Sequence, residues 1–244
     1  MNDQRVLVAV PTLNEAENIL ELLLGLRISL PDAELLVIDD SSSDGTDLLV
    51  MNFASTDTKT SLITRPNKQG VGSAHKLAFE QASLKGVDIL VTLDADLTHN
   101  PKDIPRLLNH IGNFDLVVGS RFLPDGGLEN WTPLRKLLTH VGHFATRKLL
   151  GIPYDATGSL RAYRLSCVFS ILEKQNLSDG YTWFYESLSV LAKSGLSVCE
   201  IPITLSARTY GSSKMKLNDV IFGALNLFKF RFSVLNSIQP SYEK

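Results

Sequence analysis

Short apolar runs alternate with helix-forming segments through the first half of the chain, and this alternation restricts the fold more than any other feature. The predicted strands are Val6 to Val10, Leu35 to Ile38, Ser61 to Thr64, Ile89 to Leu93 and Leu116 to Val118. The predicted helices between them are Glu15 to Leu26, Ser43 or Asp44 to Phe53, Gly72 to Ala82 and Pro101 to Ile111. Continuous apolar strands separated by helices predict an α/β fold with a mostly parallel sheet and helices on both faces.

Polar motifs follow the predicted strands at the points where they end. They are Pro11-Thr12-Leu13-Asn14-Glu15, Asp39-Asp40, Asp94-Ala95-Asp96 and Gly119-Ser120-Arg121. Ligands of parallel α/β sheets bind at the carboxyl ends of the strands, near the point where the strand order switches. The motifs therefore predict one site at one edge of the sheet.

The Asp94-Ala95-Asp96 motif predicts a metal site. Two carboxylates just past a buried strand can both face Mg²⁺ or Mn²⁺, which fills the rest of its shell with phosphate oxygens and water. Such an ion neutralises charge on a leaving diphosphate. A helix cap with a spare carboxylate is the alternative, and the strand before the motif favours the metal. His99 adjoins the motif, and its expected role is a structural hydrogen bond.

The other strand-end motifs predict contacts to a nucleotide. The Asp40 carboxylate can accept hydrogen bonds from a base or a ribose. Ser43, Asp44 and Gly45 are expected to turn the chain and cap the next helix. Glu15 falls in a first helical turn, where the helix dipole favours a carboxylate.

The second half of the chain has a different pattern. We predict a helix from Trp131 to Leu150, an edge strand from Thr157 to Tyr163, helices at Arg164 to Gln175 and Tyr181 to Ser194, a strand from Val198 to Leu205, a loop from Ser206 to Lys216 and a last helix from Leu217 to Leu235. The predicted organisation is one catalytic domain over residues 1–216, with a nucleotide-binding half at 1–122 and an acceptor half at 123–216. Residues 217–244 form a C-terminal amphipathic helix and tail.

The last predicted helix carries an apolar stripe at helical spacing, formed by Leu217, Val220, Ile221, Ala224, Leu225, Phe228, Phe232 and Leu235. Lys229 and Arg231 interrupt it, so the helix is amphipathic rather than membrane-spanning. Three roles remain open for the stripe. It can lie on a membrane surface, cover the protein's own sheet, or dock a small membrane subunit.

Composition excludes several classes of protein. The net charge of −2 over 244 residues argues against a nucleic-acid partner. The cysteines, Cys167 and Cys199, lie far apart among apolar residues and read as buried reduced thiols. The start of the chain lacks the pattern of a signal peptide, and no uncharged apolar run is long enough to span a bilayer. We therefore expect a cytoplasmic protein, peripheral on the cytosolic face of a membrane.

Taken together, the motifs Pro-Thr-Leu-Asn-Glu, Asp-Asp-Ser-Ser-Ser-Asp-Gly-Thr, Asp-Ala-Asp-Leu-Thr-His-Asn-Pro and Gly-Ser-Arg resemble glycosyltransferase family 2, whose fold is the Rossmann-like GT-A fold. Three later segments resemble the dolichol-phosphate mannose synthases within that family. They are Gly126-Gly127 with Trp131 and Arg135, Thr157 to Arg164, and Arg208 to Lys214. The resemblance covers nearly the whole chain.

The resemblance implies a set of site residues. The nucleoside would be cradled by Pro11, Leu13, Glu15, Ile38 and Asp40, and the metal and diphosphate would be held by Asp94 and Asp96. Ala95 would also contact the nucleotide sugar. Arg121, Arg208 and Lys214 would meet the diphosphate or the acceptor phosphate and, with Asp96, form the catalytic set. Arg135 and Thr139 would lie on the acceptor side. The chain departs from the family at Leu13, where a Tyr is usual, at Thr98, where Gln or Ser is usual, and at Thr139, where Ser is usual.

The resemblance also implies an activity: inverting, metal-dependent transfer of mannose from GDP-mannose to a polyprenyl (dolichyl) phosphate. A phosphate monoester has a second pKa of about 6, so this acceptor is already anionic near neutral pH and needs no strong general base. A hydroxyl acceptor would need a carboxylate base. Glu186 and Asp155 are the candidates for that role.

Other functions remain open at this point. The same fold can use UDP-glucose or another sugar nucleotide, or a sugar or protein hydroxyl as acceptor. A catalytically inactive nucleotide-binding subunit is a further alternative, which the intact Asp94, Asp96, Arg121, Arg208 and Lys214 disfavour. A dinucleotide oxidoreductase is disfavoured because no Gly-x-Gly-x-x-Gly motif follows the first strand.

Overall fold

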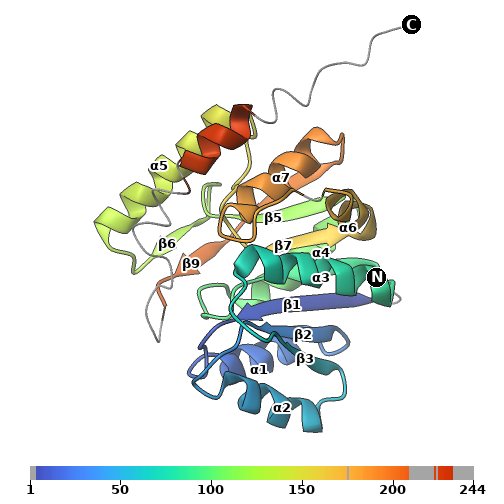
Figure 1. Ribbon diagram of the computed structural model, residues 1–244. Coiled ribbons are helices and arrows are strands. Elements are labelled where there is room, and N and C mark those ends of the chain that lie inside the picture. The colour runs from blue at the N-terminus through green and yellow to red at the C-terminus, as the bar shows by residue number, and fades with distance from the viewer. Residues whose placement is uncertain (1–3, 175, 209–222, 224, 233–244) are drawn as a thin grey trace, which may run out of the picture.

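A seven-stranded sheet in the order β3-β2-β1-β4-β7-β5-β8 forms the centre of the computed structural model, which describes residues 4–174, 176–208, 223 and 225–232 (Figure 1). Its strands are β1 (Val6–Thr12), β2 (Glu34–Asp39), β3 (Thr60–Thr64), β4 (Ile89–Thr92), β5 (Leu116–Ser120), β7 (Arg161–Arg164) and β8 (Val198–Pro202). All neighbouring strands pair in parallel except β7, which is antiparallel to both β4 and β5. The predicted mostly parallel sheet is confirmed.

Helices cover both faces of the sheet because its strands are apolar on both faces. Leu7 and Ala9 of β1 pack into one hydrophobic cluster, while Val8 and Val10 pack into the other. The helices of the first cluster are α3 (Val71–Lys85), α6 (Leu165–Leu172) and α7 (Trp183–Lys193). Those of the second are α1 (Ile19–Ser29), α2 (Thr46–Thr56) and α4 (Ile104–Ile111), the last preceded by the 3-10 turn η1 (Pro101–Asp103).

Strand β7 corrects one prediction. We expected an edge strand at 157–163, but β7 lies inside the sheet, bonded to β4 on one side and β5 on the other. Arg161 of this strand is fully buried, as its place inside the sheet requires. Its guanidinium donates to the Ala156 carbonyl at 3.1 Å and to the Ser187 hydroxyl at 3.3 Å, and these bonds satisfy part of its donor capacity within the core.

The segment 198–205 corrects a second prediction, because it forms two strands instead of one. Strand β8 pairs with β5, and β9 (Thr204–Ser206) pairs with β6 (Gly127–Glu129) in a separate two-stranded sheet. Pro202 lacks a backbone N–H and ends the first ladder. Other boundaries shift by a few residues: α1 begins at Ile19 because residues 15–18 form a turn, and α5 (Pro133–Leu150) begins after the Thr132 cap.

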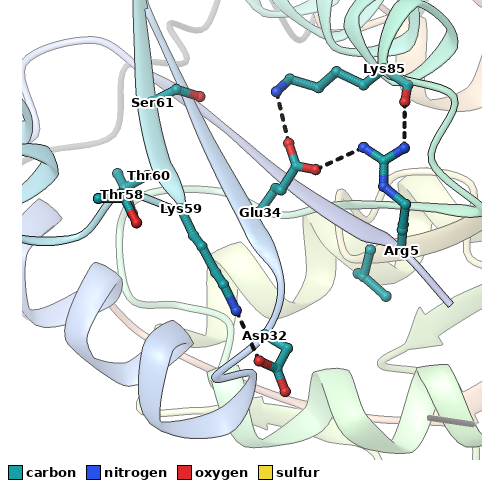
Figure 2. A pocket seen from close by; sticks show the side chains of 9 residues that line it. Arg5, Asp32, Glu34, Thr58, Lys59, Thr60, Ser61 and Lys85 are labelled. Carbon is teal, nitrogen blue, oxygen red and sulfur yellow. Dashed lines mark hydrogen bonds and ion pairs between the residues drawn. The ribbon is translucent and has the colours of Figure 1, made fainter. Parts of the chain in front are cut away.

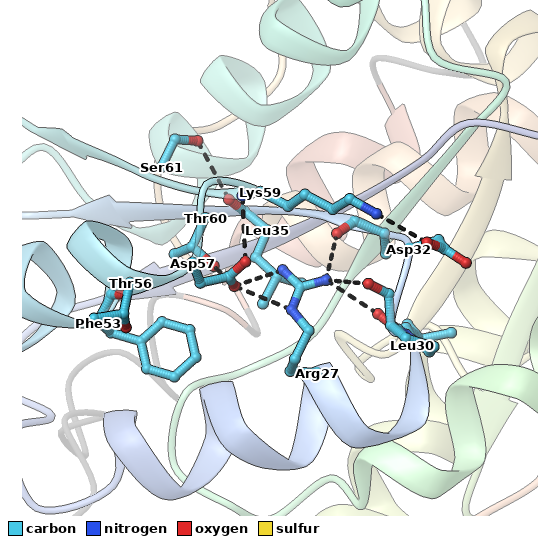
Figure 3. A network of polar contacts seen from close by, with 12 residues as sticks. Arg27, Leu30, Asp32, Leu35, Phe53, Thr56, Asp57, Lys59, Thr60 and Ser61 are labelled. Atoms are coloured by element: carbon cyan, nitrogen blue, oxygen red, sulfur yellow. Dashed lines mark hydrogen bonds and ion pairs between the residues drawn. The ribbon is translucent and has the colours of Figure 1, made fainter.

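A polar network lies at the amino-terminal ends of β2 and β3, opposite the strand-end motifs (Figure 3). Arg27, in the last turn of α1, donates to the Asp57 carboxylate at 2.7 Å and to the carbonyls of Leu30, Pro31 and Ala33. Asp57 also accepts from the Thr60 hydroxyl at 2.6 Å. This single guanidinium therefore ties the end of α1 to the turns before β2 and β3.

The described part of the last helix consists of Gly223 and residues 225–232. Leu227 is buried, and the Phe230 ring meets Tyr185 of α7 at 6.1 Å. Leu225, Phe228 and Phe232, members of the predicted stripe, are instead exposed. The other stripe members, Leu217, Val220, Ile221, Ala224 and Leu235, lie outside the described residues, as does Lys214. Among the described helices, none has the length and apolar character needed to cross a bilayer.

Gly72 shows how closely the two halves of the chain pack. A Cβ atom at this position would lie 2.4 Å from the Ser178 carbonyl oxygen and 2.7 Å from the Asp179 carbonyl carbon. We expect Gly72→Ala to lower the free energy of unfolding by about 2 kcal/mol, because backbone atoms have to move. Urea unfolding followed by circular dichroism measures the change.

Gly142, in the middle of α5, provides the matched control. A Cβ there meets nothing within 4 Å, so Gly142→Ala is expected to raise stability by up to about 1 kcal/mol through helix propensity. Equal stability of Gly72→Ala and the unmodified protein would contradict the close packing described above.

Candidate functional site

A cavity of about 270 Å³ opens at the carboxyl ends of β1, β2 and β4. It lies at the switch in strand order, where β1 is flanked by β2 on one side and β4 on the other. The predicted site residues that line it are Pro11, Leu13, Glu15, Asp40, Asp94, Ala95, Asp96 and Arg208. The structure thus brings most of the predicted nucleotide and metal residues to one place.

The remaining predicted residues lie elsewhere. Ile38 is fully buried in the core beneath the cavity floor. Arg121 is not among the described residues that line the cavity. Arg135 and Thr139 lie on α5, where the Arg135 guanidinium stacks 5.0 Å from the centre of the Trp131 ring. Their predicted roles stay predictions.

Several lining residues were missed from the sequence, namely Thr12, Arg65, Lys68, Gly70, Val71, Ala74, Gly180 and Tyr181. Those from Arg65 to Val71 follow β3 and lead into α3, so the same strand-end reasoning applied to the third strand would have found them. Gly180 and Tyr181 precede α7, far along the chain, and carry no local signal.

The backbone is strained where three of the motifs leave their strands. Asn14, Ser41 and Leu97 adopt positive φ angles of 52°, 60° and 59°. Asn tolerates this left-handed conformation better than most residues, whereas for the bulky Leu97 it is an outlier. Conformations of this kind cost of order 1–3 kcal/mol each and cluster at functional sites. The turns therefore hold the motifs in geometries that a relaxed loop would not adopt.

Adjacent carboxylates at the end of β2 have separate tasks. Asp39 is fully buried and accepts from the Thr12 hydroxyl at 2.9 Å, so it locks the end of β1 to that of β2. Asp40 faces the cavity, accepts from the backbone N–H groups of Gln69 and Gly70, and pairs with Arg65 at 2.8 Å. Burial lowers the pKa of Arg65, and Asp40 opposes that shift. These contacts fix the orientation of the Asp40 side chain.

Asp94, Asp96 and His99 form a cluster whose potential ligand atoms all lie within 4.8 Å of one another. Thr98 donates its hydroxyl to Asp96 at 2.6 Å and so orients that carboxylate. Burial, followed by repulsion from Asp96, raises the pKa of Asp94. The Nε2 atom of His99 is buried without a hydrogen-bond partner. Carboxylate oxygens are the ligands that suit Mg²⁺ or Mn²⁺, so Asp94 and Asp96 fit the predicted metal.

Arg208 supplies positive charge to this cluster in the structure. Its Nε atom lies 2.6 Å from an oxygen of Asp96, and its side chain is mostly buried. Two neighbouring carboxylates repel each other strongly in a poorly solvated site, and a cation offsets the repulsion. The same side chain lines the cavity together with Asp94 and Asp96.

Arg121 and Asp155 form a buried ion pair beside the cavity. The Arg121 guanidinium donates to both carboxylate oxygens, at 2.8 and 2.7 Å, and to the Thr157 hydroxyl at 2.6 Å. Burial opposes ionisation of Asp155, but Arg121 overrides it and lowers the pKa of Asp155 to about 2. Both oxygens of this carboxylate are occupied by Arg121.

Glu186 is likewise engaged. It is buried on α7 and accepts from the Ser178 backbone N–H and from the Ser178 hydroxyl, both at 2.7 Å. It does not line the cavity among the residues that the structure describes. Neither carboxylate considered as a base for a hydroxyl acceptor is therefore placed to serve as one.

A second cavity, of about 380 Å³, opens at the opposite, amino-terminal ends of the strands (Figure 2). Its cations already have partners: Arg5 and Lys85 both pair with Glu34, and Lys59 pairs with Asp32. Three cations against two carboxylates leave a single net positive charge, and the metal-type cluster found among the described residues, at Asp94, Asp96 and His99, does not lie in this cavity. The cavity at the carboxyl ends is the better candidate for an active site.

Comparison with known proteins finds a family and relatives that this chain resembles. Residues 7–169 match the family described as Glycosyl transferase family 2. An undecaprenyl-phosphate mannosyltransferase of Micrococcus luteus is 38% identical over 86% of this chain and 87% of its own length. A polyprenol monophosphomannose synthase of Mycolicibacterium smegmatis is 36% identical over 89% of this chain and 83% of its own length.

Solved structures show the same fold at lower identity. Glucosyl-3-phosphoglycerate synthase from Mycobacterium tuberculosis, in complex with Mn²⁺, UDP and glucosyl-3-phosphoglycerate, superposes with a TM-score of 0.69 and 18% sequence identity. The match covers 98% of this chain and 82% of that one. A complex of that synthase with Mg²⁺ and UDP gives a TM-score of 0.68. At this identity the likeness establishes the fold alone.

The Arg121–Asp155 pair generates a prediction about stability. Because the folded pKa of Asp155 lies below its unfolded value of about 3.9, its ionisation stabilises the fold above that pH and ceases to do so as pH falls toward 2. We expect Asp155→Asn to lose about 2–3 kcal/mol of unfolding free energy at pH 7 and a smaller amount below pH 4. Urea unfolding between pH 7 and pH 3 measures both values.

Asp32 offers a control, because it forms an exposed ion pair with Lys59. Asp32→Asn should change stability little at any pH. A loss for Asp155→Asn that stays constant down to pH 3 would show that the pair does not hold its carboxylate ionised.

Proposed function

The chain belongs to glycosyl transferase family 2, and on that basis we propose that it transfers mannose from GDP-mannose to a polyprenyl phosphate. The observation that carries the proposal is the Asp94–Asp96 cluster with Arg208 at the switch point of the sheet. The names of the two curated relatives, both polyprenyl-phosphate mannosyl enzymes, supply the substrate class.

The nucleoside and the diphosphate of the donor would bind in different parts of the cavity. The nucleoside would lie beside Leu13, Asp40 and Arg65, where fixed hydrogen-bonding groups face the cavity. The diphosphate would lie at Asp94 and Asp96, with Arg208 as a cationic partner. A Mg²⁺ or Mn²⁺ ion bound there would neutralise charge on the leaving diphosphate. Lys214 is proposed for the same phosphates, although it lies outside the described residues.

A phosphate acceptor is consistent with the lack of a carboxylate placed to act as a general base among Asp155 and Glu186. Asp155 and Glu186 are engaged elsewhere, so no base is assigned to them, and an anionic phosphate oxygen needs none. That oxygen forms a bond to the anomeric carbon as the bond from carbon to diphosphate oxygen breaks, and the electron pair leaves with the nucleoside diphosphate. Attack opposite the leaving group inverts the anomeric configuration. Arg121, Arg135 and Thr139 are proposed to lie along the acceptor path.

The lipid part of the acceptor has a matching surface on α5. Five large apolar side chains of this helix are at least 49% exposed, namely Leu134, Leu137, Leu138, Val141 and Phe144. Arg135, Arg147 and Lys148 are exposed on the same helix. An apolar stripe with basic neighbours is typical of helices that lie on an anionic membrane. We propose that α5, with the exposed side of the last helix, holds the enzyme on the membrane.

The metal and acceptor assignments lead to a first test. We expect Asp96→Ala to reduce transfer at least a thousandfold with the fold intact, because the carboxylate pair no longer holds the ion. The assay measures lipid-linked sugar from a panel of GDP-mannose, UDP-glucose and other sugar nucleotides with Mn²⁺ and polyprenyl phosphate. Excess chelator should have the same effect.

Asp32→Ala, at the far end of the strands, should leave transfer unchanged. Full activity of Asp96→Ala or of the chelated enzyme would exclude the metal role. A preference for UDP-glucose would reassign the donor, and transfer to free sugars but not to polyprenyl phosphate would reassign the acceptor.

The α5 surface leads to a second test. The double variant Leu137→Glu with Phe144→Glu should lower sedimentation with phosphatidylglycerol vesicles at least tenfold, because burial of each apolar side chain contributes about 1.5–3 kcal/mol. Transfer to a long polyprenyl phosphate should fall, while transfer to a short, water-soluble prenyl phosphate should persist.

Leu84→Glu is the matched control, because Leu84 is 79% exposed on α3, away from the proposed membrane surface. Equal vesicle binding by both variants would show that α5 does not contact the membrane. Loss of transfer to the short acceptor as well would point to a role for α5 in chemistry rather than in membrane binding.

A further inference from the structure

The loop from Leu177 to Tyr181 crosses from the second half of the chain onto the nucleotide-binding half. It runs directly into α7, and its last two residues, Gly180 and Tyr181, line the cavity. Tyr181 is 37% exposed. It is the only aromatic side chain among the described residues that line this cavity.

The loop is seated on the first turn of α3. The backbone N–H groups of Gly72 and Ser73 donate to the Asp179 carbonyl at 2.8 and 3.2 Å. A Cβ at Gly70 would lie 2.5 Å from that same carbonyl oxygen, so glycine permits the close approach. These amides are used by the loop, and the first turn of α3 therefore does not offer them to a phosphate, as many helix N-termini do.

Side chains fasten the loop at both ends. Lys76 of α3 donates to the Leu177 carbonyl and pairs with the Asp179 carboxylate at 2.8 Å. Glu186 of α7 accepts both the backbone N–H and the hydroxyl of Ser178 at 2.7 Å. Bonds to a buried carboxylate are stronger than bonds between neutral groups. Glu186 therefore fixes the loop from the side away from the cavity.

Further hydrogen bonds connect the first turn of α3 to Asp40 and Arg65, which line the proposed nucleoside part of the cavity. Gly70 donates its N–H to Asp40 at 2.9 Å and accepts at its carbonyl from Arg65 at 3.1 Å. Arg65 also donates to the Ser73 hydroxyl at 3.0 Å. A continuous chain of contacts thus joins Glu186 to Asp40 through the loop and the first turn of α3.

We propose that Tyr181 contacts the nucleoside of the bound donor and that Glu186 is the positioning residue that holds the loop, and thereby Tyr181, in place. This inference rests on the proposed function, since it assumes a nucleoside diphosphate donor. Every base has an aromatic face on which a tyrosine ring can stack, and Tyr181 lines the same cavity as Asp40, Gly70 and Val71. Both Glu186 oxygens are occupied by Ser178, so Glu186 acts through the loop.

The first experiment compares two probes on Tyr181 variants. With Mn²⁺ present, calorimetry measures the binding of GDP and of inorganic pyrophosphate, which lacks the nucleoside. Tyr181→Ala should weaken GDP binding about tenfold and leave pyrophosphate binding within twofold, while Tyr181→Phe should bind GDP within threefold of the unmodified protein. Unchanged GDP binding by Tyr181→Ala, or equal weakening of both probes, would overturn the assignment to the nucleoside.

The second experiment separates positioning from catalysis at Glu186. Glu186→Ala should raise the donor KM about tenfold with kcat within threefold. Glu186→Gln should have a donor KM close to that of the unmodified enzyme, because its amide can accept from the Ser178 N–H and donate to the Ser178 hydroxyl. A hundredfold loss of kcat in Glu186→Gln would identify a general base instead and overturn the proposal, as would an unchanged KM in Glu186→Ala.

Glu173→Ala is the matched control, since Glu173 is an exposed residue at the end of α6. Its KM and kcat should equal those of the unmodified enzyme. Failure of the unmodified protein to bind either GDP or UDP with Mn²⁺ would refute the proposed function itself. Normal binding there, combined with normal GDP binding by Tyr181→Ala, would refute only the inference about the loop.

Discussion

Repulsion between two neighbouring carboxylates, Asp94 and Asp96, is the constraint around which this structure is organised. β4 carries them to the edge of the sheet, the strained turn at Leu97 holds them there, and Thr98 fixes the direction of Asp96. Nearby positive charge favours the ionised form of both members of such a pair. Arg208 provides that charge in the structure. The negative potential of the two carboxylates also favours binding of a divalent ion, which can in turn bind phosphates.

Two further ion pairs, Arg65–Asp40 and Arg121–Asp155, are formed before any substrate binds. Arg65 neutralises Asp40, and Arg121 neutralises Asp155, each over a contact shorter than 3 Å. Buried pairs contribute little net stability, since desolvation offsets much of their attraction, but they fix orientation. Groups fixed before substrate arrives need no rearrangement during reaction, and this preorganisation is the main way in which enzymes stabilise developing charge.

The sequence predicted what depends on local pattern and missed what depends on distant packing. The apolar runs identified the parallel strands, and the motifs after β1, β2 and β4 identified Asp40, Asp94 and Asp96. The position of β7 was predicted wrongly because the buried Arg161 reads as a surface residue until its partners are known. Tyr181 was missed for a similar reason, since it reaches the cavity only because Gly70 and Gly72 let a remote loop approach α3.

Strand β7 has a consequence for synthesis of the protein on the ribosome. β4 and β5 are complete by residue 120, yet they do not pair with each other, because β7 fills the space between them. Until residue 164 has left the ribosome, both strands present unpaired backbone edges, which are templates for aggregation. The nascent chain therefore has a window of more than forty residues, from Ser120 to Arg164, in which the edges of β4 and β5 that face β7 are unpaired, and the other edge of β5 stays unpaired until β8 has followed at Val198–Pro202.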